Sequence, residues 1–298
     1  MKLKQLAHGV FYISGRENIG VIVNGDRALI VDSGLEAETG KKILRLLEGE
    51  GLRLAAIVNT HSHADHCGGN AYLKAKTGAK VYAPELEAGI IQYPYLEPLC
   101  FFSGARPLPE LKNKFLMAEP SEVDHVIGGG EARLQAEGIE VGIVPLPGHT
   151  PSQIGVEAGG VLFCADSIFS RETLDKHKIL FYTDIGLQKQ TLAFLKESRY
   201  KMYVPSHGEP AGDIGGLVDA TLKSIEAVEA CVWKAAGEGR TAQEILKAVC
   251  DRCGVRIKNI RHYFLMNTII LAHLSYLQGE GKVEAWVEGN GMWWRGRG

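Results

Sequence analysis

The chain of 298 residues is 45% hydrophobic and 23% charged, and it carries a formal net charge of −2 at pH 7. This composition is typical of a soluble globular protein, and the length suits one large domain followed by a small one. No apolar run approaches the roughly 20 residues that cross a bilayer, so we expect no membrane partner.

The cellular compartment is indicated by the N-terminus and by the cysteines. Residues 1–8 lack the continuous apolar stretch of a secretory signal. The six cysteines are scattered without the spacing of a disulfide framework. We therefore expect a cytoplasmic protein.

Short strands and one helix open the chain. Apolar residues at 10–13, 19–23 and 28–31 predict three strands joined by turns, and the apolar spacing over 38–48 predicts a helix. The apolar run 55–59 has the length of a buried parallel strand. Active sites of layered α/β proteins lie where such strands end, which directs attention to the residues that follow.

Residues 61–66 hold three histidines and one aspartate, namely His61, His63, Asp65 and His66. Neutral imidazole and carboxylate are ligands that Zn²⁺ prefers. Four such groups packed together without a cation would suffer desolvation and mutual repulsion. The segment therefore predicts a metal site.

The segment at 92–117 differs from its surroundings. Four prolines between residues 94 and 109 argue against a regular element, and several aromatic side chains give it apolar bulk. Long loops of this kind are commonly lids, binding loops or interfaces. We interpret it as a wall of the substrate pocket, with a homodimer interface or simple packing as alternatives.

The second half of the chain repeats the strand-rich plan of the first. Strands predicted at 139–145, 161–164 and 202–205 lead to His149, Asp166 and His207 respectively. Every candidate ligand thus follows a strand. This arrangement predicts an α/β protein built as a two-sheet sandwich flanked by helices.

These motifs together resemble those of the metallo-β-lactamase-fold metallohydrolases, with a glyoxalase-II-like core. The resemblance rests on His-x-His-x-Asp-His followed by Gly68-Gly69, and on four further elements in the expected order. Those elements contain Asp32, His149, Asp166 and His207. The resemblance covers about residues 1–215 and implies the αββα sandwich of that fold.

The resemblance also implies a dinuclear metal site. It assigns His61, His63 and His149 to one metal, and Asp65, His66 and His207 to a second, with Asp166 bridging the two. Two Zn²⁺ per chain are expected, with Fe or Mn as alternatives. Asp32 is either a supporting residue of this site or an ordinary turn aspartate.

The implied reaction is hydrolysis by a hydroxide that bridges the metals, with Asp65 orienting the water and taking its proton. A small acyl ester, thioester or lactone is the favoured substrate. One alternative is a metal-dependent phosphodiesterase or ribonuclease. A second is a mononuclear iron sulfur dioxygenase that uses only His61, His149 and Asp166.

The C-terminal part of the chain resembles the winged-helix-like appendage of some members. A long helix over 214–236 ends near Gly237, which predicts domains at 1–237 and 238–298. A capping box at Thr241 to Glu244, helices within 256–278 and a hairpin over 283–295 follow. Residues 240–298 hold nine Lys/Arg against five Asp/Glu, so nucleic acid is an alternative partner to a small molecule. No basic cluster that would bind glutathione is apparent in the catalytic body.

Overall fold

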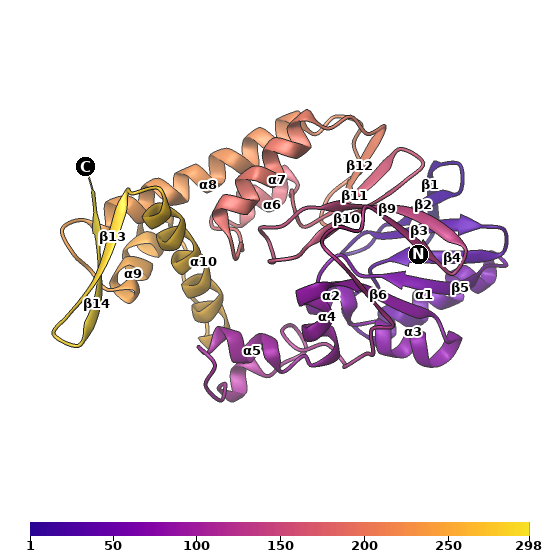
Figure 1. The fold of residues 1–298 in the computed structure, drawn as a ribbon, viewed down its shortest axis with the longest axis horizontal. Coiled ribbons are helices and arrows are strands. Elements are labelled where there is room, and N and C mark those ends of the chain that lie inside the picture. The colour runs from indigo at the N-terminus through magenta and orange to yellow at the C-terminus, as the bar shows by residue number, and fades with distance from the viewer. Residues whose placement is uncertain (298) are drawn as a thin grey trace.

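The computed structural model describes residues 1–297, and two large β-sheets lie in the part that holds the N-terminus, with the C-terminal helices extending to one side (Figure 1). The larger sheet has the strand order β1-β2-β3-β4-β5-β6-β7, and the smaller has β12-β11-β10-β9-β8. The strands are β1 (Leu3–Ala7), β2 (Val10–Ile13), β3 (Ile19–Asn24), β4 (Arg27–Val31), β5 (Arg53–Val58), β6 (Lys80–Pro84), β7 (His125–Ile127), β8 (Arg133–Ala136), β9 (Ile139–Pro145), β10 (Ile154–Ala158), β11 (Val161–Ala165) and β12 (Met202–Pro205).

The two sheets pack against each other through one apolar core. Val31 and Val58 of the larger sheet share this core with Val141, Val156 and Phe163 of the smaller one. Gly20 is needed at the closest approach, because a Cβ there would lie 2.8 Å from the Phe163 ring. The fold therefore buries one face of each sheet in the other.

Helices cover the outer faces, so the αββα sandwich expected from the sequence is confirmed. On the larger sheet, Ile43 and Leu47 pack against Ile57 and Val81. On the smaller sheet, Leu192 and Ile225 belong to a separate cluster. The helices are α1 (Ala37–Gly49), α2 (Ala64–Cys67), α3 (Asn70–Thr77), α4 (Glu85–Gln92), α5 (Leu96–Phe101), η1 (Pro109–Leu111), α6 (Arg171–Lys176), α7 (Ile185–Glu197), α8 (Gly215–Ala236), α9 (Ala242–Cys253) and α10 (Ile260–Gly279).

The strand directions bring the candidate ligands to one edge of the sandwich. Strands β4 to β7 run parallel. In the smaller sheet, β9 and β12 run in the same direction as β11. The two sheets are joined at this edge, where the Ile154 N–H donates to the Thr60 carbonyl at 3.0 Å.

The segment 92–117 contains a helix, so the prediction of no regular element was wrong there. Pro98 lies in the first turn of α5. The N–H groups of a first turn have no acceptor within the helix, so the N–H that proline lacks costs no helical hydrogen bond. Phe102 packs on Phe264 of α10, with ring centroids 5.3 Å apart. The segment thus joins the catalytic body to the C-terminal helices (Figure 1).

The C-terminal part consists of α8, α9, α10 and a hairpin of β13 (Val283–Glu288) with β14 (Gly291–Gly296). The capping box at Thr241 and Glu244 is present as predicted. Val228 and Val232 of α8 share a core with α9 and α10. The domain boundary at residue 237 and the winged-helix assignment stay predictions. None of the helices within residues 1–297 is both long and apolar enough to span a bilayer.

We predict that Ile269→Ala lowers the free energy of unfolding by about 2–5 kcal/mol, because it leaves a cavity in the C-terminal core. Ile269 is fully buried there. Leu271→Ala on the same helix is the matched control, since Leu271 is 41% exposed. This variant is expected to lose less than about 1 kcal/mol of unfolding free energy. Chemical denaturation measures both. Equal losses of unfolding free energy in the two variants would contradict the burial of Ile269 in the C-terminal core.

Candidate metal centre

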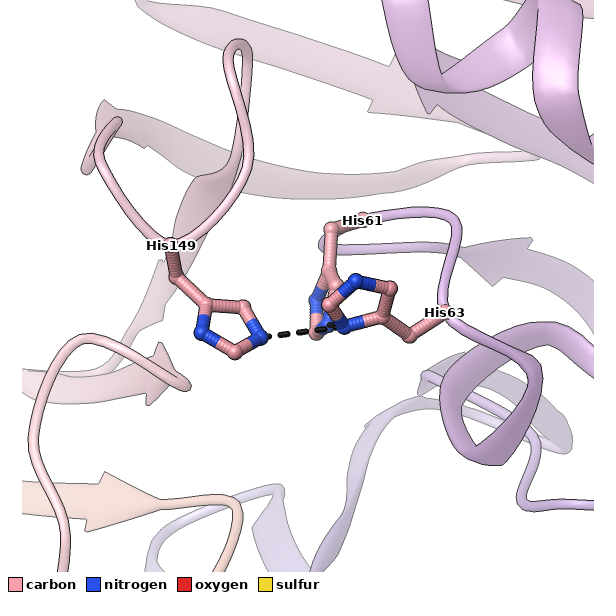
Figure 2. A group of neighbouring side chains, drawn as sticks. All are labelled: His61, His63 and His149. Atoms are coloured by element: carbon pink, nitrogen blue, oxygen red, sulfur yellow. Dashed lines mark hydrogen bonds between the residues drawn. The ribbon is translucent and has the colours of Figure 1, made fainter. Parts of the chain in front are cut away.

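Five histidines and two aspartates meet at the edge where the strands end. His61 and His63 lie in the loop after β5, and His149 follows β9. Asp166 follows β11 directly, and His207 follows β12. Figure 2 shows His61 and His63 on one loop facing His149 on another.

Three imidazole nitrogens converge in the first group. His63 Nδ1 lies 3.1 Å from His61 Nε2 and 3.0 Å from His149 Nε2. Two nitrogens bound 2.0–2.1 Å from one tetrahedral ion would lie about 3.3 Å apart. The first group therefore has nearly the spacing of a ligand set.

A second group lies beside the first and shares a carboxylate with it. Asp65, His66 and His207 each bring one ligand atom within 4.8 Å of the others. Asp166 is 3.4 Å from His149 Nε2 and 3.6 Å from both His66 Nε2 and His207 Nε2. Asp166 thus lies between the groups, where a bridging ligand is expected.

In each ring, the hydrogen bond made by the nitrogen on the outer side determines which nitrogen faces the site. His149 Nδ1 donates to the Phe181 carbonyl and His207 Nδ1 to the Arg16 carbonyl, both at 3.0 Å. A carbonyl can only accept, so in the neutral form of each ring Nε2 keeps its lone pair. His61 Nδ1 lies 3.0 Å from Thr60 Oγ1. Such outer contacts are typical of metal-binding histidines.

Asp32 orients His66 in the same way. Its Oδ2 accepts from His66 Nδ1 at 2.8 Å and from the Thr60 hydroxyl. Its Oδ1 accepts from the Thr60 N–H. Asp32 has a left-handed φ of 65°, a conformation that aspartate tolerates better than most residues. Of the two interpretations from the sequence, the supporting residue is the one that these contacts match.

Eight buried side-chain atoms have no hydrogen-bond partner among the described residues, and two of them belong to the residues of the two groups. These two are His66 Nε2 and Asp166 Oδ1. Buried polar atoms are normally satisfied, and a cation between the two groups would satisfy both. The residues present therefore fit a metal centre.

Burial and neighbouring charges set the protonation of the ring nitrogens. Burial lowers the pKa of His149 to about 3 and holds the pKa of His61 well below its usual value. Burial also lowers the pKa of His66, but the carboxylates of Asp32 and Asp166 outweigh it and raise that pKa to about 10. Without metal, His66 therefore stays protonated at neutral pH.

Sequence reasoning missed two buried carboxylates at this site. Glu87 of α4 accepts from the N–H and hydroxyl of Ser62 and from those of Ser152. It therefore connects the loop of His61 and His63 to the segment that follows His149. Glu17 is 6% exposed, and burial raises its pKa. Neither residue belongs to a recognisable motif.

A cavity of about 760 Å³ opens in front of the centre. Asp65, His149, Asp166 and His207 lie at its inner end, and Phe169 and Phe181 line its wall. None of the described residues at 92–117 lines it, so the prediction that this segment forms the pocket wall was wrong. Phe101 instead contacts Phe181, with ring centroids 6.0 Å apart.

A protein-family model matches the part of the chain that contains these residues. The family model of the metallo-beta-lactamase superfamily matches residues 14–207, which include all seven residues of the two groups. The chain belongs to the metallo-beta-lactamase superfamily. The resemblance inferred from the sequence is thereby confirmed, and this membership implies a metal cofactor.

The curated relatives of this superfamily member include hydroxyacylglutathione hydrolases. That of Albidiferax ferrireducens is 32% identical over 148 residues, which are 48% of this chain and 44% of the relative. That of Dechloromonas aromatica is 34% identical over 152 residues, 51% of this chain and 43% of the relative. The chain thus spans less than half the length of each of these relatives.

Solved structures share the fold over nearly the whole chain. A metallo-beta-lactamase family protein from Thermus thermophilus matches with a TM-score of 0.71 and 19% identity, covering 98% of this chain and 100% of that one. A beta-lactamase domain protein from Burkholderia ambifaria matches with a TM-score of 0.74 and 17% identity, covering 99% and 93%. At these identities the likeness shows the fold alone.

We predict that Glu87→Gln weakens zinc binding by about 10–100-fold, the range typical of residues that position metal ligands. The amide nitrogen would face an N–H donor where the structure has a carboxylate oxygen. A competition titration with a chromophoric chelator measures the affinity. Glu85→Gln is the control, because Glu85 is exposed on the same helix; equal affinities in the two variants would contradict the role of Glu87.

We also predict that zinc binding at pH 7 releases about one proton from His66. Its pKa of about 10 means that Nε2 carries a proton at pH 7, and a metal needs that lone pair. Binding should therefore strengthen as the pH rises towards 10. Calorimetry in two buffers of different ionisation enthalpy counts the protons. The Asp32→Asn variant should release fewer protons on zinc binding. A count near zero for the wild-type protein would refute the protonation of His66.

Proposed function

We propose that this protein is a hydrolase of small acyl thioesters that depends on two divalent metal ions, with zinc as the expected metal. The proposal rests on the two ligand groups that share Asp166 at the inner end of a cavity. The first ion would be held by His61, His63 and His149, and the second by Asp65, His66 and His207. Iron and manganese are the alternatives for the metal.

When bound, the ions would supply a Lewis acid for the acyl oxygen and make water a stronger acid. The chain supplies the geometry and a base. Asp65 lines the cavity and lies 3.6 Å from His207, where its carboxylate can accept the proton of the attacking water. Water adds to the acyl carbon, the carbon–sulfur bond breaks, and the products are a carboxylic acid and a thiol.

The relatives favour the thioester over the other substrates. Hydroxyacylglutathione, in the name of those relatives, is a thioester, whereas a phosphodiesterase has no such support. A mononuclear iron dioxygenase would use only His61, His149 and Asp166, and would leave the cluster of Asp65, His66 and His207 without a role. A small molecule is therefore the proposed partner, and the cytoplasmic location remains part of the proposal.

A hydrolysis panel on the purified, zinc-loaded enzyme tests the proposal. The panel contains acyl-thioesters, lactones, bis-p-nitrophenyl phosphate and single-stranded RNA. We expect thioester turnover that is lost on chelation and restored by zinc, with close to two metals per chain by elemental analysis. Absence of zinc uptake, or turnover confined to the phosphodiesters, would refute the proposal.

We predict that Asp65→Asn lowers kcat by about 10²–10⁴-fold, the range for loss of a general base, while KM changes little. The amide keeps the shape of the side chain but cannot take a proton. One preparation should be assayed for kcat, KM and metal content. The ion held by the three histidines of the first group should remain. Near-native kcat with two metals bound would show that Asp65 is neither base nor essential ligand.

A further inference from the structure

A second cavity of about 470 Å³ adjoins the cavity of the metal centre. The two share Lys176, His177, Ile179, His262 and Met266 in their walls. Its size lies within the range of about 300–1,000 Å³ that is usual for ligand sites. A molecule could therefore extend from the metal centre into this second space.

Positive charge dominates the second cavity, which we call the cation groove. Its lining includes five cationic side chains and no carboxylate. None of the five forms a salt bridge with any residue in the range 1–297. The five are Lys176, Lys178, Arg256, Lys258 and Arg261.

Two separate segments supply these cations. Lys176 ends α6 and Lys178 follows it, whereas the other three lie in the α9–α10 connection and the first turn of α10. Asn259 caps α10 by accepting from the His262 N–H at 2.9 Å. Arg261 lies over the Phe115 ring at 4.8 Å, a contact that orients the guanidinium without neutralising it. The fold thus gathers cations from segments that are far apart in the chain.

The neighbouring histidines add hydrogen-bonding groups to this charge. Burial lowers the pKa of His177 and of His262, and nearby lysines lower both further. Both rings are therefore neutral at pH 7. The Lys258 N–H donates to His262 Nδ1 at 3.3 Å, so His262 Nε2 carries its proton and is free to donate.

We propose that the cation groove binds phosphate groups on the thiol portion of the substrate, so that the substrate is an acyl thioester of a nucleotide-bearing thiol of the coenzyme A class. This inference rests on the proposed thioester hydrolysis. The acyl carbon would lie at the metal centre, and the thiol arm would pass the shared wall into the groove.

Charge decides between this class and a peptide thiol such as glutathione. The glutathione portion carries two carboxylates and one ammonium group, so its net charge of about −1 does not require five cations. A nucleotide with a diphosphate and a further phosphate carries several more negative charges, and lysine and arginine bind phosphates by charge-assisted hydrogen bonds. The sequence of the catalytic body shows no basic cluster by itself, and the groove gains one where Lys176 and Lys178 meet the three cations of the C-terminal segment.

The first test compares two thioesters that carry the same acyl group. One is the coenzyme A thioester, and the other is the N-acetylcysteamine thioester, which lacks every phosphate. We expect kcat/KM to be at least about 100-fold higher for the first in low salt, since each charged hydrogen bond contributes tenfold or more. The ratio should fall as salt is added. A ratio below about threefold would overturn the inference and leave thioester hydrolysis intact.

The second test changes the groove. Lys258→Gln and Arg261→Gln should each lower the ratio of the two kcat/KM values by about tenfold, through KM of the coenzyme A thioester. Arg252→Gln is the control, because Arg252 is an exposed cation near the end of α9 that does not line the groove. Circular dichroism confirms that each variant is folded. Equal ratios in all three variants would overturn the inference.

A binding measurement separates the groove from the reaction. Adenosine 3′,5′-bisphosphate should bind the wild-type protein in calorimetry, and the Lys258→Gln variant about tenfold more weakly. If no thioester is hydrolysed, the proposed function fails, and this measurement alone decides whether the groove binds phosphates. Cleavage of single-stranded RNA that the bisphosphate inhibits would overturn the inference in favour of a nucleic acid substrate.

Discussion

The structure depends on the convergence of buried imidazoles and carboxylates that satisfy one another only in part, since His66 Nε2 and Asp166 Oδ1 have no hydrogen-bond partner within residues 1–297. His63 Nδ1 lies within 3.1 Å of two other ring nitrogens, and a single ring proton on it can be donated to only one of them at a time. The orientation of these rings is nevertheless fixed from outside, by Thr60, Asp32 and two backbone carbonyls that lie on different elements. Holding so many polar groups close together in a buried site costs free energy, and a bound cation would offset part of that cost. The two-sheet sandwich provides the required rigidity, because all the ligand loops leave its strands at one edge.

The histidines and aspartates that gather at this edge were all named from the sequence, because they lie in the segments that follow apolar strands. The sequence could not predict Glu87, whose partners Ser62 and Ser152 lie far from it in the chain and carry no metal-binding character. The edge strand β1 was also missed, since most of its residues are only partly buried or exposed and lack the alternation of a half-buried strand. In the segment 92–117 the proline count was misleading, because a proline in the first turn of a helix does not oppose it.

Charge counted along the chain gave only a weak signal for the C-terminal part. The count over residues 240–298 includes Glu284 and Glu288 of the hairpin, and Glu284 pairs with Arg295 and Arg297. These pairs lie away from the cation groove and dilute the apparent basicity. The relevant cations come from the end of α6 and the residue pair after it, and from the α9–α10 connection and the first turn of α10, which the fold brings together. The local density of positive charge thus depends on the tertiary structure, and the charge counted along a segment of the sequence does not reveal it.

The C-terminal helices also act on the metal centre through packing. Ile179 belongs to the same apolar core as α8, α9 and α10, and two residues later the Phe181 carbonyl accepts from His149 Nδ1. Thr183 N–H then donates to the Gly148 carbonyl at 2.9 Å. One short segment therefore connects the C-terminal core to the orientation of a first-group histidine. Because α10 also lines the cavity through His262, Leu265 and Met266, the C-terminal part completes the site and is more than an appendage to it.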